Sequence, residues 1–311
     1  MTNPSAVTSI DGITLQHHHI STNGIQLHVV EAGIPSNSSV FLLHGFPDFW
    51  LGWRHQIKAL VDAGFHVIIP DQRGYNTSDK PLQTKDYAVT QLVDDLSGIA
   101  RYFQLQTYNI VGHDWGAMVA WWSAILQPES LRRLAILNVP HPFVMAQALR
   151  RNPRQMFRSW YALFFQVPYV SESVMSVVLK QGKAMEKDSP KAFPAAVMPN
   201  YHEAWAQPGA LKAMIQWYRA ALRYPVASSM IKNQGVIQTP TLMIWGTKDP
   251  YLGRELAPPS IERYCNQGRL EYLEDCGHWI QQEQSAKVNQ LLLEFLKSEL
   301  ERSNPTALAT K

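Results

Sequence analysis

Short, wholly apolar segments separated by longer amphipathic ones are the feature of this sequence that most limits its fold. Three of them lie in the first half of the chain, Val40–Leu43, Val67–Pro70 and Leu134–Leu137, and a fourth segment there, Tyr108–Gly112, is apolar except for Asn109. Strands without polar residues are typical of a mostly parallel sheet that is buried on both faces by helices. The pattern therefore predicts an α/β fold, with a mostly parallel central sheet and helices on both faces.

The segments that connect these strands have the spacing expected of helices. Helices are predicted over Trp53–Ala63, Gln91–Phe103 and Trp115–Leu126. Before the first apolar strand, two β-rich runs, Gln16–Ser21 and Ile25–Ala32, flank the dipeptide Asn23-Gly24. This dipeptide favours a tight turn because both residues tolerate positive φ, so the chain is expected to begin with a β-hairpin.

The strand–helix alternation stops in the middle of the chain. Between Pro140 and Gly235 there are only helical stretches interrupted by prolines, and strand signals return at Thr241–Trp245 and Leu270–Leu273. One long amphipathic helix is expected last, over Trp279–Glu301. We interpret the interruption as an inserted helical cap, which divides the chain into a core domain of residues 1–139 and 236–311 and a cap domain of residues 140–235.

Composition excludes several classes of protein. The 311 residues are 46% hydrophobic and carry a net charge of only +3, which argues against disorder and against nucleic acid as the main partner. Two cysteines, Cys265 and Cys276, are too few for a disulfide framework and lack metal-binding spacing. The start, Met1–Ser5, has no signal-peptide pattern, and no apolar run reaches the ~18–20 residues of a membrane span. We expect a cytoplasmic protein without integral membrane association.

The run Gly112-His113-Asp114-Trp115-Gly116 lies where a predicted strand meets a predicted helix. It has the spacing of the nucleophile elbow G-x-S-x-G, with Asp114 in place of serine. The elbow lifts one side chain above the carboxyl edge of the sheet, and the start of the following helix favours a negative charge there. Asp114 is therefore a candidate nucleophile. The alternative is that Asp114 only caps the helix.

Another strand-end loop is expected to lie beside this elbow. His44, Gly45, Phe46 and Pro47 directly follow the strand Val40–Leu43. An oxyanion hole in this arrangement uses one backbone N–H from such a loop and one from the residue after the nucleophile. The predicted donors are the amides of Phe46 and Trp115. The alternative is an ordinary turn at the end of a strand.

Two later strands end near residues that complete a catalytic set. Asp249 follows the strand Thr241–Trp245, and His278 follows the strand Leu270–Leu273. Taken singly, each could be a structural residue in a turn or at the start of a helix. Together with Asp114 they give the order nucleophile, acid, histidine, which is the chain order of the α/β-hydrolase triad.

With these motifs in view, the chain resembles the α/β-hydrolases, and specifically the soluble epoxide hydrolases, from about Gln16 to the last helix. The resemblance implies two acid tyrosines in the cap. Trp217-Tyr218-Arg219 is similar to the motif of the second lid tyrosine, and Tyr161, in a run of aromatic residues, to that of the first. Tyr169 and Tyr201 remain alternatives to Tyr161, because neighbouring aromatic residues permit a shifted alignment.

An aspartate at the elbow suits displacement at a saturated carbon. Its attack on an epoxide gives an ester, which water and a histidine base cleave, whereas a serine would give a stable ether. The expected reaction converts a lipophilic epoxide and water to a vicinal diol through an ester on Asp114. Tyr161 and Tyr218 would protonate the leaving oxygen, and His278, oriented by Asp249, would activate water. No cofactor or metal is required.

Other functions remain as alternatives. A haloalkane dehalogenase shares the triad, but it needs N–H donors for the halide, and Phe46 stands where dehalogenases often carry asparagine. A non-catalytic ligand-binding protein on the same fold is the alternative from another class. The oligomeric state, monomer or homodimer, is left open.

Two clusters lie outside the predicted site. The histidines His17, His18 and His19 alternate along a predicted strand without partners for a metal site. Residues 150–154, with the sequence RRNPR, are a basic cluster at the start of the cap. We interpret it as a solvated surface, with contact to a membrane surface as the alternative.

Overall fold

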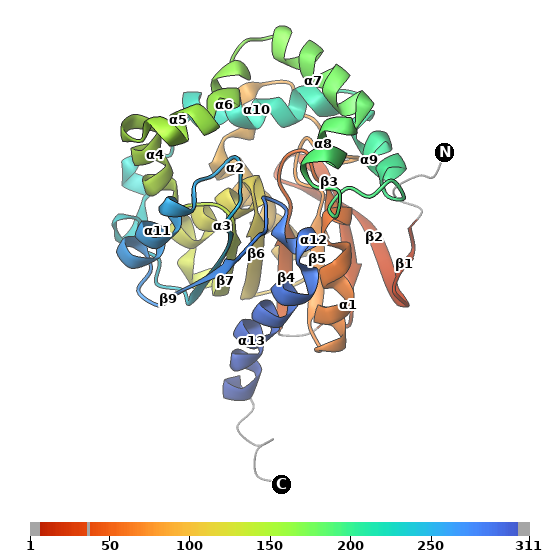
Figure 1. Cartoon of the computed structure of the whole chain (residues 1–311). Coiled ribbons are helices and arrows are strands. Elements are labelled where there is room, and N and C mark those ends of the chain that lie inside the picture. The colour runs from red at the N-terminus through yellow and green to blue at the C-terminus, as the bar shows by residue number, and fades with distance from the viewer. Residues whose placement is uncertain (1–6, 36–37, 304–311) are drawn as a thin grey trace.

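The computed structural model describes residues 7–35 and 38–303, so the expectation about Met1–Ser5 lies outside the described residues (Figure 1). Within the described chain, one nine-stranded sheet has the order β1-β2-β3-β5-β4-β6-β7-β8-β9. The strands are β1 Ser9–Ile10, β2 Ile13–Thr22, β3 Ile25–Ala32, β4 Ser39–Leu43, β5 His66–Pro70, β6 Tyr108–His113, β7 Leu131–Leu137, β8 Thr241–Gly246 and β9 Gly268–Leu273. From β5 to β9 all neighbours in the sheet are parallel, as the apolar segments predict.

The predicted hairpin is present as the antiparallel pair β2 and β3. Thr22 pairs with Ile25 across the turn, and the two turn residues, Asn23 and Gly24, have φ of 49° and 74°. Both residues therefore occupy the left-handed region that a two-residue hairpin turn requires. β3 also pairs antiparallel with β5, which joins the hairpin to the parallel part of the sheet.

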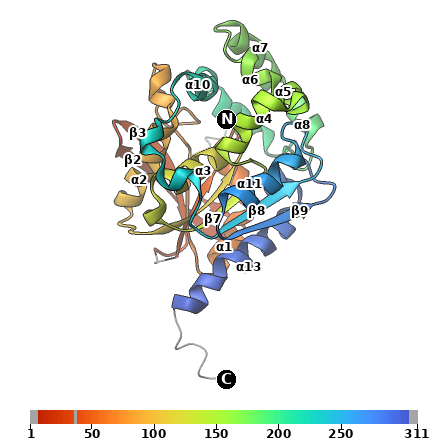
Figure 2. The same cartoon turned by 90° about the vertical axis from the view of Figure 1, so that its left-hand side faces the viewer.

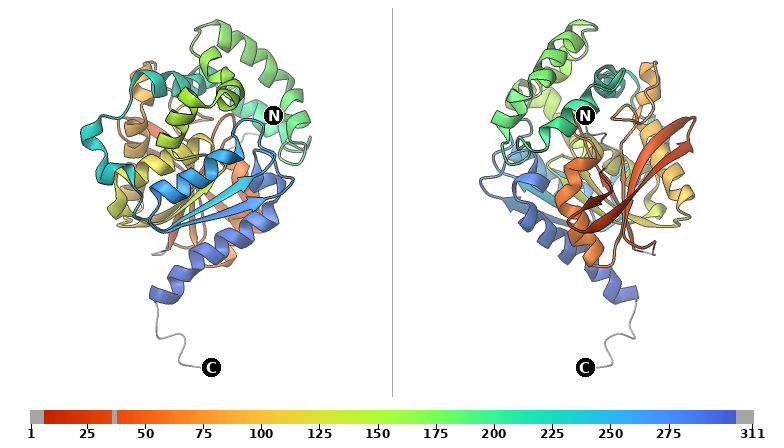
Figure 3. Two further views of the ribbon diagram at one scale, coloured as in Figure 1. Left: turned by 60° about the vertical axis from the view of Figure 1, so that its left-hand side comes forward. Right: turned by 90° about the vertical axis from the view of Figure 1, so that its right-hand side faces the viewer.

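Helices cover both faces of the sheet, which confirms the predicted fold class. The core helices are α1 Arg54–Asp62, α2 Val89–Tyr102, α3 Trp115–Leu126, α11 Ala257–Tyr264, α12 Ile280–Glu283 and α13 Ser285–Ser303. α1 packs beside α13 on one face, and α2 packs beside α3 on the other (Figure 3). Strands β4, β5 and β6 are buried throughout, and the candidate site lies in the loops that follow the carboxyl ends of the parallel strands.

The segment between β7 and β8 forms a helical layer above the carboxyl ends of the parallel strands (Figures 1 and 2). Its helices are α4 Pro142–Arg151, α5 Pro153–Arg158, α6 Trp160–Phe164, α7 Val170–Gln181, α8 Lys183–Asp188, α9 Met198–Trp205 and α10 Ala210–Arg223. Short 3₁₀ helices occur at Trp50–Trp53, Thr84–Tyr87, Pro128–Ser130, Ser228–Met230, Lys232–Gly235 and Arg254–Leu256. A helical cap inserted into an α/β core is the predicted architecture. The division at residues 140 and 235 stays a prediction.

The final helix differs from the prediction of one helix over Trp279–Glu301. The chain leaves the helical conformation at Gln284, with φ of −129° and ψ of 50°, which separates α12 from α13. The carboxylate of Glu283 turns back at this break and accepts hydrogen bonds from the amides of Gly277 (2.6 Å) and Trp279 (3.2 Å). The break therefore fixes the loop that carries His278.

Candidate active site

Asp114 is the single residue between β6 and α3, and its backbone is strained. Its φ of 51° and ψ of −124° lie outside the regions that most residues adopt. The two motif glycines make this turn fit: a Cβ at Gly112 would collide with the carbonyl of Gly116, and a Cβ at Gly116 would collide with the carbonyl of Leu43. The Asp114 side chain makes no capping hydrogen bond to α3, which does not fit the alternative of a simple helix cap.

The loop after β4 touches the Asp114 carboxylate directly. The Phe46 amide donates a 2.6 Å hydrogen bond to Asp114 Oδ1, and the Phe46–Pro47 peptide bond is cis. A Cβ at Gly45 would overlap the same carboxylate, so only glycine lets the loop approach this closely. Trp115 is the first residue of α3, and an amide there has no partner within its own helix. The structure thus places the Phe46 amide against the nucleophile candidate, and the role of the Trp115 amide stays a prediction.

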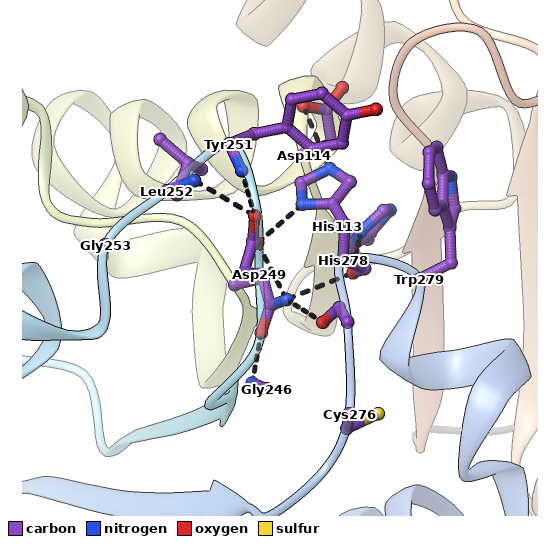
Figure 4. A network of polar contacts seen from close by, with 12 residues as sticks. His113, Asp114, Gly246, Asp249, Tyr251, Leu252, Gly253, Cys276, His278 and Trp279 are labelled. Carbon is purple, nitrogen blue, oxygen red and sulfur yellow. Dashed lines mark hydrogen bonds and ion pairs between the residues drawn. The ribbon is translucent and has the colours of Figure 1, made fainter. Parts of the chain in front are cut away.

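Asp249 and His278 meet at the ends of β8 and β9 (Figure 4). His278 Nδ1 lies 2.7 Å from Asp249 Oδ2, and His278 Nε2 lies 3.6 Å from Asp114 Oδ2. The other oxygen of Asp249, Oδ1, accepts hydrogen bonds from the amides of Tyr251 (2.7 Å) and Leu252 (2.9 Å). The imidazole therefore bridges two carboxylates, one of which is held firmly by backbone amides.

Electrostatics in this trio favour the charged forms. Burial disfavours a charge on His278, but the carboxylates of Asp249 and Asp114 outweigh burial and raise its pKa to about 10. Burial likewise opposes ionisation of Asp114, and here the contact with His278 prevails, so the pKa of Asp114 is lowered. In the resting protein Asp114 is thus an anion paired with an imidazolium.

Asn138 is a buried residue of this site that sequence reasoning missed. It follows β7 with a φ of 57°, and its Nδ2 donates to Asp249 Oδ2 (2.9 Å) and to the carbonyl of Gly277 (2.8 Å). Its Oδ1 accepts a 2.6 Å hydrogen bond from the amide of Gly246. Asn138 therefore ties together the three loops that follow β7, β8 and β9. Its position directly after a buried apolar strand, at the same edge of the sheet as the loop of Asp249, is the signal that could have found it.

His113 is a second missed residue, next to the elbow aspartate. It is buried, and its Nε2 lies 2.9 Å from the carbonyl oxygen of His278. Burial, helped by repulsion from His278, lowers the pKa of His113 to about 3. His113 is therefore neutral, so it supports the backbone of His278 without competing for the negative charge of Asp114.

Tyr161 and Tyr218 approach each other from the cap. Tyr161 lies on α6 and Tyr218 on α10, with their ring centroids 5.9 Å apart. The Tyr218 ring also meets the rings of Trp115 (4.9 Å) and Phe46 (5.6 Å), the residues that flank the Asp114 carboxylate. Burial, with the Asp114 charge second, raises the pKa of both phenols, so both hydroxyls stay protonated.

The two alternative tyrosines lie elsewhere. Tyr169 precedes α7 with 83% of its surface exposed. Tyr201 is buried on α9, and its hydroxyl donates a 2.8 Å hydrogen bond to Asp48 Oδ1. The geometry therefore favours Tyr161 as the partner of Tyr218.

Asp48 anchors the cap to the loop after β4. It is buried, and burial, only partly offset by the Tyr201 hydrogen bond, raises its pKa to about 6. Next to it, the Trp205 indole donates a 2.6 Å hydrogen bond to the carbonyl of Pro47. Cap helix α9 thus holds the loop whose Phe46 amide contacts Asp114.

The histidines near the amino terminus form hydrogen-bonded chains instead of a metal site. His17 contacts His28 (2.9 Å), and His28 contacts the buried carboxylate of Asp71 (2.6 Å). In the part of the chain that the structure describes, no group of three or more His, Cys, Asp or Glu side chains is placed to hold a metal ion. The expectation of a metal-free reaction stays a prediction.

Comparisons with known proteins agree with this architecture. The family model described as the alpha/beta hydrolase fold matches residues 39–284. The AB hydrolase superfamily protein YfhM of Bacillus subtilis is 42% identical over 295 residues, which cover 93% of this chain and all of that protein. Epoxide hydrolase 4 of Homo sapiens is 33% identical over 301 residues, which cover 92% of this chain and 79% of that protein.

Solved structures extend the likeness to three dimensions. Epoxide hydrolase A from Mycobacterium thermoresistibile superposes with a TM-score of 0.76 at 29% identity, covering 91% of this chain and 98% of that one. The Bacillus megaterium epoxide hydrolase, solved with an inhibitor, gives a TM-score of 0.77 at 28% identity. The superposition covers 90% of this chain and 100% of that one. The chain therefore belongs to the α/β-hydrolase fold family and, within it, to the epoxide hydrolases.

Proposed function

We propose that this protein hydrolyses a lipophilic epoxide to a vicinal diol through a covalent ester on Asp114. The observation that carries the proposal is the contact set of the Asp114 carboxylate. One oxygen accepts the Phe46 amide at 2.6 Å, and the other lies 3.6 Å from the imidazole of His278. An aspartate so placed is an ionised nucleophile with a hydrogen-bond donor and a base candidate in reach. The relatives named as epoxide hydrolases support the same chemistry.

In the first step, an Asp114 oxygen attacks one ring carbon of the epoxide. A carbon–oxygen bond of the ring breaks, and its electrons move to the ring oxygen, which stays attached to the substrate. Tyr161 and Tyr218 supply the proton, since the raised pKa of each phenol keeps it protonated at neutral pH. Two neighbouring tyrosines on the cap, with ring centroids 5.9 Å apart, suit an oxygen leaving group. They therefore support an epoxide over the haloalkane alternative, in which N–H donors receive a halide.

Formation of the ester changes the state of His278. The free enzyme holds an imidazolium because two carboxylates raise the pKa to about 10. Esterification removes the charge of Asp114, so the pKa of His278 falls and the ring loses its proton, which balances the proton given up by a tyrosine. His278 thus becomes a base when the ester exists, and Asp249 keeps it oriented.

In the second step, His278 takes a proton from water, and the hydroxide attacks the carbonyl carbon of Asp114. The Phe46 and Trp115 amides bind the resulting oxyanion, and donors of this kind are worth about 3–4 kcal/mol each. Collapse of the intermediate breaks the bond between the carbonyl carbon and the substrate oxygen. The leaving oxygen takes the remaining proton of the added hydroxide, so Asp114 returns to a carboxylate and His278 keeps the proton that it took from water. The diol leaves with the epoxide oxygen plus one former Asp114 oxygen, and Asp114 retains an oxygen from water.

Replacing His278 by Gln tests the scheme. The variant should react once with an epoxide and stop at the ester, so intact-protein mass spectrometry should show the mass of the substrate added to Asp114. His55→Gln, which changes an exposed histidine, is the matched control and should turn over without an adduct. Diol formation by His278→Gln without an adduct would refute the two-step scheme.

A further inference from the structure

The outer side of the cap carries a band of exposed apolar side chains, which we call the cap face. Phe157 on α5 is 81% exposed and Leu163 on α6 is 69% exposed. The cap face as a whole consists of Phe157, Trp160, Leu163, Val170, Val174 and Val177. Figures 1 and 2 show α5, α6 and α7 at the outer edge of the molecule, on the side away from the sheet.

The apolar residues follow the periodicity of one helix side. On α7, Val170, Val174 and Val177 are spaced by four and three residues, so they lie in one row, whereas Ser171 and Leu179 are buried. On α6, Leu163 points outward, while Tyr161 packs inward against Tyr218. These helices are therefore apolar on two sides, and the part of the chain that the structure describes covers only the inner one.

The basic cluster predicted from the sequence borders this cap face. Arg150, Arg151 and Arg154 are exposed, and within residues 7–35 and 38–303 none of the three forms an ion pair. Residues 142–181 contain four arginines, one lysine and one glutamate, a net charge of 5 − 1 = +4, against +3 for the whole chain. The glutamate, Glu172, is already paired with Arg219 at 2.6 Å.

We propose that the cap face binds the surface of an anionic lipid bilayer. Exposed aromatic and aliphatic side chains beside unpaired arginines are the combination that holds a peripheral helix in the headgroup region. Glu255 lies beside Asn152 (3.3 Å) and pairs with Arg158 (3.8 Å), so anionic headgroups would supply negative charge to Arg150, Arg151 and Arg154. Among the described helices none is long and apolar enough to cross a membrane, so the contact is peripheral.

A second copy of the chain fits the cap face less well than an anionic lipid surface does. A twofold-symmetric contact places the same patch on both subunits, so the arginines of one copy would face those of the other. The only carboxylate in residues 142–181 is engaged with Arg219 and is not available to offset that repulsion. Charge therefore favours the lipid surface.

The test is sedimentation of the full chain with sucrose-loaded vesicles, which needs no substrate and so does not depend on the epoxide chemistry. The protein should pellet with vesicles of phosphatidylglycerol and phosphatidylcholine, and much less with phosphatidylcholine alone. The triple variant Arg150→Gln/Arg151→Gln/Arg154→Gln should bind about 100-fold more weakly, since each basic residue near such a surface contributes about fivefold. The double variant Phe157→Ser/Leu163→Ser should lose about tenfold or more per side chain.

A control variant separates the cap face from apolar exposure in general. Ile34 and Leu82 lie outside this face and are each 82% exposed, so Ile34→Ser/Leu82→Ser should bind vesicles like the unmodified chain. Failure of the unmodified chain to pellet with anionic vesicles would overturn the proposal. Binding of the cap-face variants to these vesicles as tightly as the unmodified chain would overturn it too. A dimer in sedimentation velocity that Phe157→Ser dissociates, without vesicle binding, would instead assign the cap face to a contact between copies.

Discussion

The two halves of the candidate site are held in different ways. Asp249, in the core, accepts hydrogen bonds from two backbone amides and from the Asn138 side chain, and it contacts His278 at 2.7 Å. Tyr218, in the cap, lies among aromatic rings, with those of Phe165 and Trp115 at 4.8 and 4.9 Å. Directional bonds fix the groups that must align with a reacting carbon, whereas ring packing suffices for a neutral proton donor.

In the proposed reaction, this difference assigns separate tasks to the two regions. The core holds charges and forms and breaks bonds, because buried ion pairs are stable only when their hydrogen bonds are satisfied. The cap supplies uncharged acids and an apolar wall, so it can vary in shape without leaving a charge unpaired. Substitutions in the core should therefore abolish a chemical step, while substitutions in the cap should slow one.

The largest expected effect comes from a substitution in the core. Asp114→Ala removes the nucleophile, so diol formation should fall by a factor on the order of 10⁵–10⁶, as for other covalent nucleophiles. No ester should appear in intact-protein mass spectra at any time. Circular dichroism should match that of the unmodified chain, because alanine leaves the partly exposed Asp114 position without a buried charge. Diol production within tenfold of normal would show that Asp114 is not the nucleophile.

Changes in the cap should have smaller and step-specific effects. Tyr218→Phe and Tyr161→Phe each remove one proton donor, so the rate of ester formation should fall by about 10²–10⁴-fold. Hydrolysis of the ester should change less than about threefold, because that step uses His278 and the backbone amides. Stopped-flow single turnovers separate the two rates. Tyr169→Phe, at an exposed position, is the matched control. If Tyr218→Phe lowered the rate of ester hydrolysis more than the rate of ester formation, Tyr218 would not be the acid.

The sequence predicted the core better than the cap, and the reason is physical. A buried parallel strand is mostly apolar and ends in a loop at the sheet edge, so the strand ends, the elbow spacing and the chain order together could place Asp114, Asp249 and His278. The nearby Asn138 escaped because an asparagine after a strand is also an ordinary turn residue. Its role depends on three loops that meet only in the folded chain.

The cap offers no comparable rule. Tyr161 and Tyr169 occur in the same aromatic-rich stretch, and Tyr201 lies on another cap helix. Which tyrosine faces Asp114 depends on how short helices pack, not on a strand end. The same limit explains the predicted helix Trp279–Glu301, because its break at Gln284 is set by the contacts of Glu283 with the loop before it.

The response to pH sharpens the comparison further. Ester formation needs ionised Asp114 and protonated tyrosines, and the lowered and raised pKa values provide both between pH 6 and 9. The rate of ester formation should therefore not change with pH in this range. Hydrolysis needs neutral His278, and in the ester only Asp249 still raises the pKa of this ring. The hydrolysis rate should therefore rise by up to about tenfold per pH unit until the ring is deprotonated. Single turnovers at pH 6, 7, 8 and 9 measure both rates. A flat hydrolysis rate would exclude His278 as the base.

The smallest expected effect concerns Asn138, which positions the core groups without touching substrate. Asn138→Gly keeps the positive φ acceptable but leaves the Gly246 amide and one Asp249 oxygen with fewer partners, which should lower stability by about 2–4 kcal/mol. Ester hydrolysis should slow about tenfold because His278 is oriented through Asp249, while ester formation stays unchanged because Asp114 keeps its Phe46 contact. Urea unfolding and single turnovers measure these quantities, with the exposed Asn266→Gly as control. Equal slowing of both steps would mean that Asn138 supports the fold in general and not the alignment of the acid and the histidine.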